Sequence, residues 1–295
     1  MTEPKTIDGR HKKVIESIGE EQVLISRQPG KPLLLLVRMA ARGMGGWDGV
    51  WDGLCKRFSV AQFNLRRPTV DELKSPENVF KRLAADCVKK MTQLGFDSFH
   101  ILGWAGGTHV ALRCAVDHAE VLRSCTLVNP FFPLQDMRPV NKGNEFLKQM
   151  LQSGGRELYA YYWFMAGLSP QFVRTRFDEV ESMVKKRVAS DTNFNTAETE
   201  QMAQWSRALR GFWVSEKELE SIKSPVLVVG SGLDPGYFGP SPEMAPSLHS
   251  HIPGSELAVA QQFGNLMLIE SPDTFSRLSD PFFARVCADR GVPGS

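Results

Sequence analysis

Several features that mark specialised classes of protein are missing from this sequence of 295 residues. No apolar run approaches the roughly 20 residues that a membrane-spanning helix needs. The polar and charged residues 1–13 lack the apolar core of a signal peptide. The net charge is only +2, so the sequence indicates no dedicated surface for nucleic acid. We therefore expect a cytoplasmic globular protein that binds neither membranes nor nucleic acid.

Paired cysteines are also missing. The five cysteines are scattered, and no two of them form a C-x-x-C pair. A zinc site or a redox dithiol therefore has no support, and we expect neither a metal nor another cofactor. The odd number and irregular spacing are typical of buried free thiols in a reducing compartment. The cysteines are Cys55, Cys87, Cys114, Cys125 and Cys287.

Strand-like and helix-like segments alternate through the first part of the chain. The apolar run 32–37 is typical of a strand that is buried on both faces. Helical spacing of apolar residues predicts a helix over 78–94, and Gly95 is well placed to end it. Further strands are expected at 22–26, 59–65, 99–102 and 121–128, and further helices at 47–58 and 108–119. Repeated units of this kind indicate an α/β fold with a doubly wound, mostly parallel sheet.

The pattern changes after residue 129. Strand signals vanish as far as residue 221, and helical stretches rich in aromatic residues replace them, for example over 158–165. A buried strand returns at 225–230, and a last strand at 255–260 precedes a closing helix over 271–286. The sequence therefore predicts a helical insertion between two parts of one α/β domain.

The most informative motif is Gly103-Trp104-Ala105-Gly106-Gly107, between an expected strand and an expected helix. It has the place and spacing of a G-x-S-x-G nucleophile elbow, a sharp turn that lifts a reactive hydroxyl above a sheet. The residue at its tip is Ala105, whose methyl group can neither attack a carbonyl nor give up a proton. The motif therefore predicts the turn without its nucleophile.

Together with other landmarks, this motif makes the sequence resemble the cap-containing branch of the α/β-hydrolase fold superfamily. The landmarks are segment 103–107, Trp47 beyond Arg38-Met39, Asn64-Leu65-Arg66, segment 226–234 and segment 264–272. The resemblance implies an eight-stranded, mostly parallel sheet with a helical lid. It implies a hydrolase core over 14–129 and 222–290, and a cap over 130–221.

The resemblance also implies that the catalytic triad is degenerate. The nucleophile position holds Ala105 and the base position holds Asn265, whose amide cannot shuttle a proton near neutral pH. The acid position holds Asp234, which is intact. The His-Gly pair that shapes the oxyanion pocket is replaced by Arg38-Met39, and a glycine is replaced by Arg67. None of the six histidines is expected to substitute as the base, although His109 is nearest to the elbow.

Two polar residues are candidates for chemistry. Arg38 is expected where the oxyanion pocket opens, and a guanidinium there would hold a carboxylate, phenolate or enolate. The alternative is a salt bridge from Arg38 to Asp234 or Asp48. Asp234 is either a general acid or base with a raised pKa, or a remnant that caps a loop or pairs with an arginine.

The other candidate ligand contacts are mostly apolar. Aromatic residues of the insertion would line the ceiling of the pocket, or would form only the core of the lid. A pocket of this kind would take a small apolar organic molecule, and a homodimer is left open. The candidate ligand-binding residues are Arg38, Met39, Trp104, Ala105, Gly106, Tyr159, Tyr162, Trp163 and Asn265.

Three functions remain open at this point. In the first, the protein is a non-hydrolytic biosynthetic enzyme, such as a cyclase, lyase or isomerase, that uses Arg38 and Asp234. In the second, it is a pseudo-hydrolase that acts as a ligand sensor or interaction protein. In the third, it is an ester or lactone hydrolase inactivated by a serine-to-alanine substitution at Ala105. The third explains only one of the replaced positions, so natural loss of hydrolase chemistry is favoured.

Overall fold

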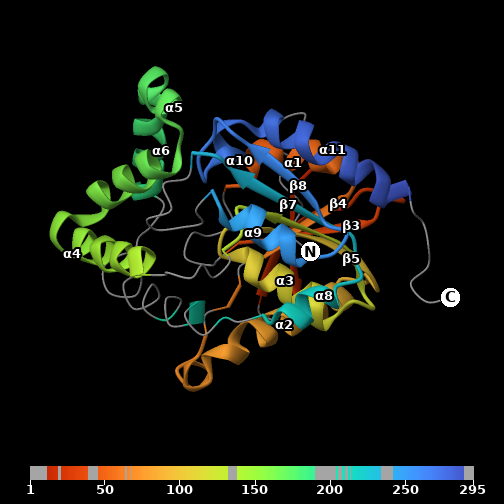
Figure 1. Ribbon diagram of the computed structural model, residues 1–295. Coiled ribbons are helices and arrows are strands. Elements are labelled where there is room, and N and C mark those ends of the chain that lie inside the picture. Colours follow the sequence, from red (N-terminus) through yellow and green to blue (C-terminus); the bar gives the residue numbers. More distant parts are fainter. Residues whose placement is uncertain are drawn as a thin grey trace.

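An eight-stranded sheet forms the centre of the protein (Figure 1). The computed structural model describes residues 12–18, 21–38, 46–63, 65–66, 68–131, 138–189, 204, 208–209, 212, 214–233 and 242–288. The strands are β1 (Val14–Ile18), β2 (Glu21–Ser26), β3 (Leu33–Val37), β4 (Ser59–Phe63), β5 (Phe99–Trp104), β6 (Leu122–Val128), β7 (Val226–Ser231) and β8 (Glu256–Ala260).

The order of the strands is β1-β2-β4-β3-β5-β6-β7-β8. β2 pairs antiparallel with both β1 and β4, and every other neighbouring pair is parallel. The predicted α/β fold with a mostly parallel, eight-stranded sheet is therefore confirmed. β1 is an edge strand that the sequence did not reveal, because its burial alternates and its apolar signal is short.

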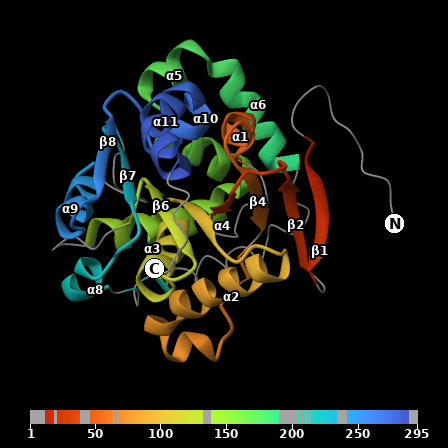
Figure 2. The same cartoon turned by 90° about the vertical axis from the view of Figure 1, so that its right-hand side faces the viewer.

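Helices cover both faces of the sheet (Figure 2). On one face lie α1 (Asp48–Cys55), α10 (Met267–Glu270) and α11 (Pro272–Ala288). On the other face lie α2 (Val79–Gln93), α3 (Gly107–Asp117), α8 (Glu216–Glu220) and α9 (Met244–His251). Two short 3₁₀ turns, η2 (Glu72–Lys74) and η3 (Pro76–Asn78), precede α2. Each face thus has its own apolar cluster, which explains why β3 is buried along its whole length.

Gly95 ends α2 as the sequence predicted. Its φ is +85°, a left-handed conformation that glycine adopts without steric cost. The amide of Gly95 donates to the Thr92 carbonyl at 2.9 Å, and the amide of Phe96 donates to the Met91 carbonyl at 3.0 Å. These two bonds satisfy carbonyls that the end of the helix would otherwise leave unpaired.

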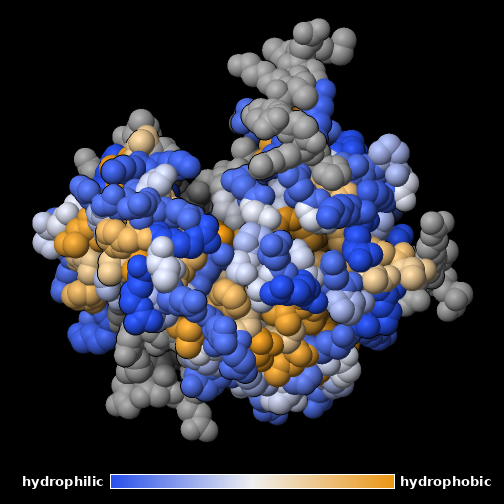
Figure 3. All heavy atoms as spheres, turned by 90° about the horizontal axis from the view of Figure 1, so that it is seen from above, coloured by the Kyte–Doolittle hydropathy of each residue, from blue (hydrophilic) through white to orange (hydrophobic). Residues whose placement is uncertain are grey.

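Three further helices project to one side of the sheet between β6 and β7, and we refer to them as the cap (Figure 1, green). They are α4 (Arg138–Gly167), α5 (Pro170–Thr175) and α6 (Phe177–Ala189). α4 is kinked at Gly155, where φ is +71°. Figure 3 shows the cap as a lobe beside the core, with hydrophobic areas set among hydrophilic ones. The proposed boundaries of the cap at residues 130 and 221 stay a prediction.

All five cysteines lie in the described part of the chain and carry free thiols. Burial raises the pKa of the Cys87 thiol to about 12, and Cys114 and Cys125 are also fully buried. These thiols therefore act as small apolar side chains of the core. No helix in the described residues is long and apolar enough to cross a membrane.

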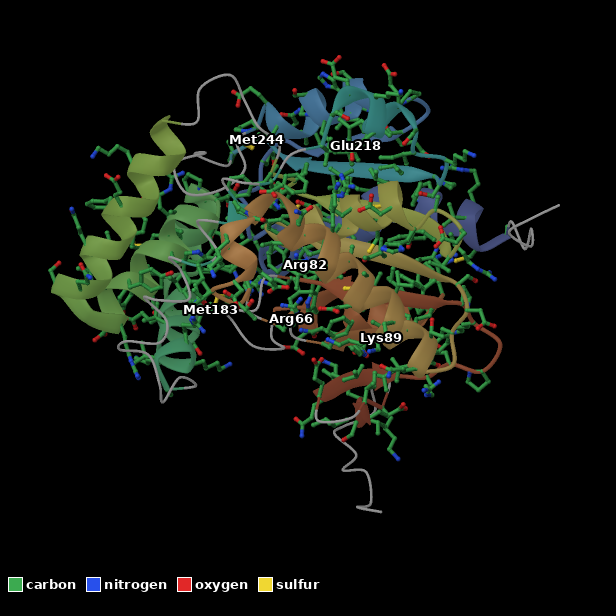
Figure 4. All side chains as sticks on the ribbon, turned by 90° about the horizontal axis from the view of Figure 1, so that it is seen from below. Arg66, Arg82, Lys89, Met183, Glu218 and Met244 are labelled. Atoms are coloured by element: carbon green, nitrogen blue, oxygen red, sulfur yellow. The ribbon has the colours of Figure 1, made fainter. Side chains whose placement is uncertain are left out.

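A charged network holds the segment that follows β4. The Arg66 guanidinium donates two bonds of 2.7 Å to the Glu72 carboxylate and one of 2.6 Å to Asp86. Arg82 lies 3.7 Å from Glu72, and Figure 4 shows both arginines on the α2 side of the molecule. The hydrogen bonds from Arg66 lower the pKa of Glu72 from its ordinary 4.5 to about 2, helped by the amide of Thr69. The ionised Glu72 therefore stabilises the fold.

This pKa predicts how stability depends on pH. Glu72 contributes its full stabilisation above pH 4.5, where the carboxyl is ionised in the folded and unfolded states, and loses it as the pH falls towards 2. We expect Glu72→Gln to lower the free energy of unfolding by about 3 kcal/mol at pH 7, and by less than half as much at pH 3. Urea unfolding at the two pH values measures this. The exposed Glu77→Gln serves as the control, and an equal loss from Glu72→Gln at both pH values would contradict the assignment.

Candidate functional site

The turn between β5 and α3 has the strained geometry of a nucleophile elbow. Ala105 has a φ of +48°, which is uncommon for a residue with a side chain. Its amide donates to the Val128 carbonyl at 2.9 Å. Its own carbonyl accepts from the Thr108 amide at 2.9 Å and from the Thr108 hydroxyl at 2.6 Å. These bonds fix the alanine methyl group at the carboxyl edge of the parallel strands.

Two glycines allow this turn to form. A Cβ on Gly103 would lie 2.7 Å from the Gly107 carbonyl oxygen, inside the start of α3. A Cβ on Gly107 would lie 2.2 Å from the Val37 carbonyl oxygen at the end of β3. Both are distances to backbone atoms, which cannot rotate away. The glycines of the motif are therefore required for α3 to begin directly beside β3, whatever residue occupies the tip.

The indole of Trp104 joins the parts of the site. Its Nε1 donates to the Asn265 carbonyl oxygen at 3.1 Å, across 161 residues of sequence. The guanidinium carbon of Arg38 lies 4.3 Å from the centre of the Trp104 ring, a cation–π contact. The Trp47 ring meets the same indole edge-on at 5.5 Å. Three predicted site residues, Arg38, Trp104 and Asn265, are thus brought together next to Ala105.

Asn265 is held by its backbone and leaves its side chain available. Besides the bond from Trp104, the backbone carbonyl oxygen of Asn265 accepts a hydrogen bond of 3.0 Å from the side-chain amide, Nδ2, of Asn129. Within the described residues, the carboxamide of Asn265 has no hydrogen-bond partner, and the residue is partly exposed. The position that resembles the catalytic base of the family therefore presents a side-chain amide on a backbone that is held in place. This amide can donate and accept hydrogen bonds, but it cannot take up a proton.

Asn129 is a site residue that the sequence analysis missed. It follows β6 with a φ of +47°, and asparagine tolerates this conformation better than most residues do. The backbone amide of Asn129 donates to the Val229 carbonyl at 2.7 Å. The sequence offered little indication that Asn129 belongs to the site, because an asparagine after a strand is also common in an ordinary turn.

The aromatic residues of α4 divide between two environments. Trp163 is half-buried against the apolar cluster that contains Trp104 and touches Ala105. Tyr159 is buried, whereas Tyr162 contacts Phe146 of the same helix with ring centres 5.9 Å apart. Of the three predicted α4 contacts, Trp163 packs against the cluster at the elbow, as do Tyr161 and Phe164 of the same helix. The predicted residues Met39 and Asp234, like Asn64 and Arg67, lie outside the described residues.

The two histidines nearest the elbow in the sequence, His109 and His100, are both buried. His109 is buried between Phe80 and Phe212, with ring centres 4.9 and 4.2 Å away. Burial lowers its pKa to about 4, although its bond to the Gly106 carbonyl acts in the opposite direction. Because a carbonyl only accepts, His109 Nδ1 carries the hydrogen in this 3.2 Å bond. His100 is likewise buried, which lowers its pKa to about 3.

Asp48, one of the alternatives for Arg38, has another partner in the structure. The sequence left open a salt bridge to Asp48, but the Asp48 carboxylate pairs with Lys13 at 2.6 Å. Asp48 lies at the start of α1, where a carboxylate is also stabilised by the helix dipole.

The curated relatives of this chain include a deacetylase and a carbamate hydrolase, although no protein-family profile matches the chain. A pyrrolizixenacetamide deacetylase from Xenorhabdus hominickii is 25% identical over 272 residues, 90% of this chain and 96% of that protein. A putative carbamate hydrolase RutD from Caulobacter vibrioides is 30% identical over 132 residues. The second match spans 42% of this chain and less than half, 43%, of that protein.

Solved structures resemble the whole chain. A serine hydrolase, CCSP0084, from Cycloclasticus zankles superposes with a TM-score of 0.73 at 18% identity, covering 94% of this chain and 99% of that one. The protein has the α/β-hydrolase fold. In this α/β-hydrolase-fold protein, the elbow, the Asn265 loop and the Arg38 position all meet at the carboxyl edge of the sheet, the usual place for ligands in open α/β folds.

The close approach of α3 to β3 predicts a steep cost for a side chain at the elbow. We expect Gly107→Ala to destabilise the protein by more than about 3 kcal/mol, because the new Cβ would overlap the Val37 carbonyl. The matched control is Gly53→Ala in α1, where a Cβ would lie 3.6 Å from the nearest atom. There, higher helix propensity should stabilise the protein by about 0.5–1 kcal/mol. Urea unfolding compares the two, and equal effects would contradict the packing argument.

Proposed function

We propose that this α/β-hydrolase-fold protein has lost serine-hydrolase chemistry and binds a small, largely apolar organic molecule beneath its cap. We assign it as a non-hydrolytic biosynthetic enzyme of the cyclase, lyase or isomerase type. The observation that carries this proposal is the intact, strained elbow with alanine at its tip, facing an asparagine that is held rigidly where the base would be.

Loss of hydrolysis follows from the chemistry of the two side chains. Acyl transfer by this mechanism needs a nucleophile and a base that accepts its proton. Ala105 offers neither lone pair nor acidic hydrogen, and Asn265 offers an amide that stays neutral. Removing either group from a serine hydrolase costs on the order of a million-fold in rate. The elbow is retained because the packing of α3 on β3 depends on it.

The groups around the elbow suit a ligand with one polar end. The Arg38 guanidinium, stacked on Trp104, offers donors to a carboxylate, phenolate or enolate oxygen. The Asn265 carboxamide offers a donor and an acceptor to a neighbouring group of the ligand. Trp104 is buried, so the half-buried Trp163 would supply apolar surface for the rest of the molecule.

Catalysis would then depend on placement and charge. A substrate bound in one reactive conformation has less entropy to lose on the way to its transition state. Arg38 would stabilise negative charge as it develops on an oxygen atom. Asp234 would accept or donate the proton that a cyclisation, elimination or isomerisation moves. The two relatives are named a deacetylase and a carbamate hydrolase, which favours a ligand that contains a carbonyl group.

A second function is a non-catalytic ligand sensor or interaction protein. The observation that favours it lies on the cap, where several large apolar side chains are about half exposed. They are Phe146, Leu158, Met165 and Phe177. Exposed apolar groups of this kind often mark a protein–protein contact. The two functions differ in one respect: only the enzyme converts the molecule that it binds.

Restoring the nucleophile alone tests whether this is an inactivated hydrolase. We expect Ala105→Ser to hydrolyse p-nitrophenyl acetate no faster than the unmodified protein, because Asn265 cannot accept the serine proton. The double variant Ala105→Ser/Asn265→His is the comparison, since it supplies both groups. Release of p-nitrophenolate is followed by absorbance. Rapid turnover by the single variant would show that a hydrolase had lost only its serine.

Ligand identification tests the enzyme itself. Native mass spectrometry of the purified protein should reveal a bound small molecule, and incubation with its precursors should yield a product. We expect Arg38→Ala to weaken ligand binding about 30-fold or more through the loss of a charged hydrogen bond, and Asp234→Asn to abolish product formation.

Circular dichroism checks that both variants fold. Arg57→Ala is the control, because Arg57 is a partly exposed arginine that pairs with Asp280 at 3.5 Å. Unchanged turnover in both Arg38→Ala and Asp234→Asn would refute the roles of these residues. Binding without any conversion would favour the sensor.

A further inference from the structure

A buried carboxylate fastens the cap to the core. Glu270, the last residue of α10, is only 9% exposed. One of its oxygens accepts from the Ser169 amide at 2.8 Å, and the other accepts from the Ser169 hydroxyl. Ser169 caps the start of α5, where its hydroxyl oxygen accepts from the Phe172 amide at 3.1 Å. Residues that are 101 positions apart in the sequence are thus joined inside the protein.

The backbone beside this contact is interlocked. The Leu266 amide donates to the Gly167 carbonyl at 2.8 Å. A Cβ on Gly264 would lie 2.5 Å from the same Gly167 carbonyl oxygen, and a Cβ on Gly167 would lie 2.8 Å from the Leu266 side chain. The end of α4 and the loop over 264–266 therefore touch with no space between them.

This loop is the one that carries Asn265. On its core side, the Asn265 carbonyl is held by Trp104 and Asn129. On the side that faces the cap, the residues before and after Asn265, Gly264 and Leu266, pack directly against Gly167. Asn265 is consequently clamped between the strand ends and the cap, and a displacement of either partner moves its carboxamide.

In the described part of the chain, Ser169 at the start of α5 compensates for the burial of Glu270. Within the described residues, Ser169 supplies the hydrogen bonds to the Glu270 carboxylate, and no ion pair involves it. A buried carboxylate is costly unless it is hydrogen-bonded, so Glu270 favours the arrangement in which the α4–α5 turn stays docked.

We propose that Glu270 is a positioning residue that locks the α4–α5 turn of the cap onto the Asn265 loop and thereby sets the place of the Asn265 carboxamide in the ligand site. The cap does not open at this end. The part of the inference that concerns ligand binding rests on the proposed function, whereas the mechanical coupling does not.

The experiment compares Glu270→Gln with Glu218→Gln in the full-length protein. Glu218 is a matched control, because its carboxylate also accepts from the amide and the hydroxyl of a serine, Ser215, but caps α8 on the opposite face of the sheet. Hydrogen exchange is measured by mass spectrometry for peptides over 167–173 and 263–268. The ¹⁹F resonance of 5-fluorotryptophan at position 104, assigned with Trp104→Phe, reports on the bond to Asn265.

We expect Glu270→Gln to raise exchange on the order of tenfold in both segments and to shift the Trp104 resonance. Glu218→Gln should change neither the exchange in these two segments nor the Trp104 resonance, even if it lowers the free energy of unfolding as much as Glu270→Gln does. Ser169→Ala should give the same pattern more weakly, and it serves as the test if Glu270→Gln does not fold. Faster exchange confined to 167–173, with an unchanged Trp104 resonance, would show that Glu270 only caps α5 and would overturn the inference.

Ligand binding is measured with 1-anilinonaphthalene-8-sulfonate, an apolar anion, as the probe. We expect Glu270→Gln to bind it at least threefold more weakly than the unmodified protein and Glu218→Gln to bind it equally well. Failure of the unmodified protein to bind the probe would count against the proposed function. The exchange comparison would still decide the positioning role of Glu270.

Discussion

The contact between the start of α3 and the end of β3 constrains everything around the site. Only a glycine at position 107 lets the helix begin against the Val37 carbonyl, and two residues earlier Ala105 has a left-handed conformation. Trp104, which precedes Ala105, contacts Arg38 and the Asn265 loop. The elbow is therefore required for packing, whatever residue occupies its tip.

In the function that we propose, the site does not carry out the acyl transfer that its elbow suggests. Ala105 and Asn265 occupy the places of a nucleophile and a base without the atoms that those roles require. The nearby His109 is not a replacement, because its burial among aromatic rings keeps it neutral and ties it to Gly106. What the site does retain is a cation stacked on an indole and an amide held at its backbone. In the proposed function, these groups bind and orient the ligand.

The cap and the core meet through polar contacts as well as apolar ones. Glu270 and Ser169 join them at the α4–α5 turn, close to the loop that presents Asn265. A buried carboxylate needs its hydrogen bonds, and Ser169 supplies those seen among the described residues, so this contact favours one arrangement of the cap. In the positioning role that we propose for Glu270, the cap is fixed at this end, and its place and that of the Asn265 carboxamide are set together.

The sequence by itself determined the fold, and it places an alanine and an asparagine where the resemblance expects a nucleophile and a base. Continuous apolar strands such as β3, the helical spacing of α2 with its terminal Gly95, and the glycines at 103 and 107 are local signals that need no partner to be read. The sequence did not reveal β1, because its alternating pattern is short and weak. It also did not decide whether Arg38 pairs with Asp48, pairs with Asp234 or binds a ligand.

Only the tertiary structure decided which polar groups hold the site together. The bond from Trp104 to Asn265 spans 161 residues, the one from Ser169 to Glu270 spans 101, and Asn129 joins the site through its conformation. Contacts of this kind leave no local periodicity in a chain. They depend on where the carboxyl ends of separate strands and the end of a distant helix meet in space.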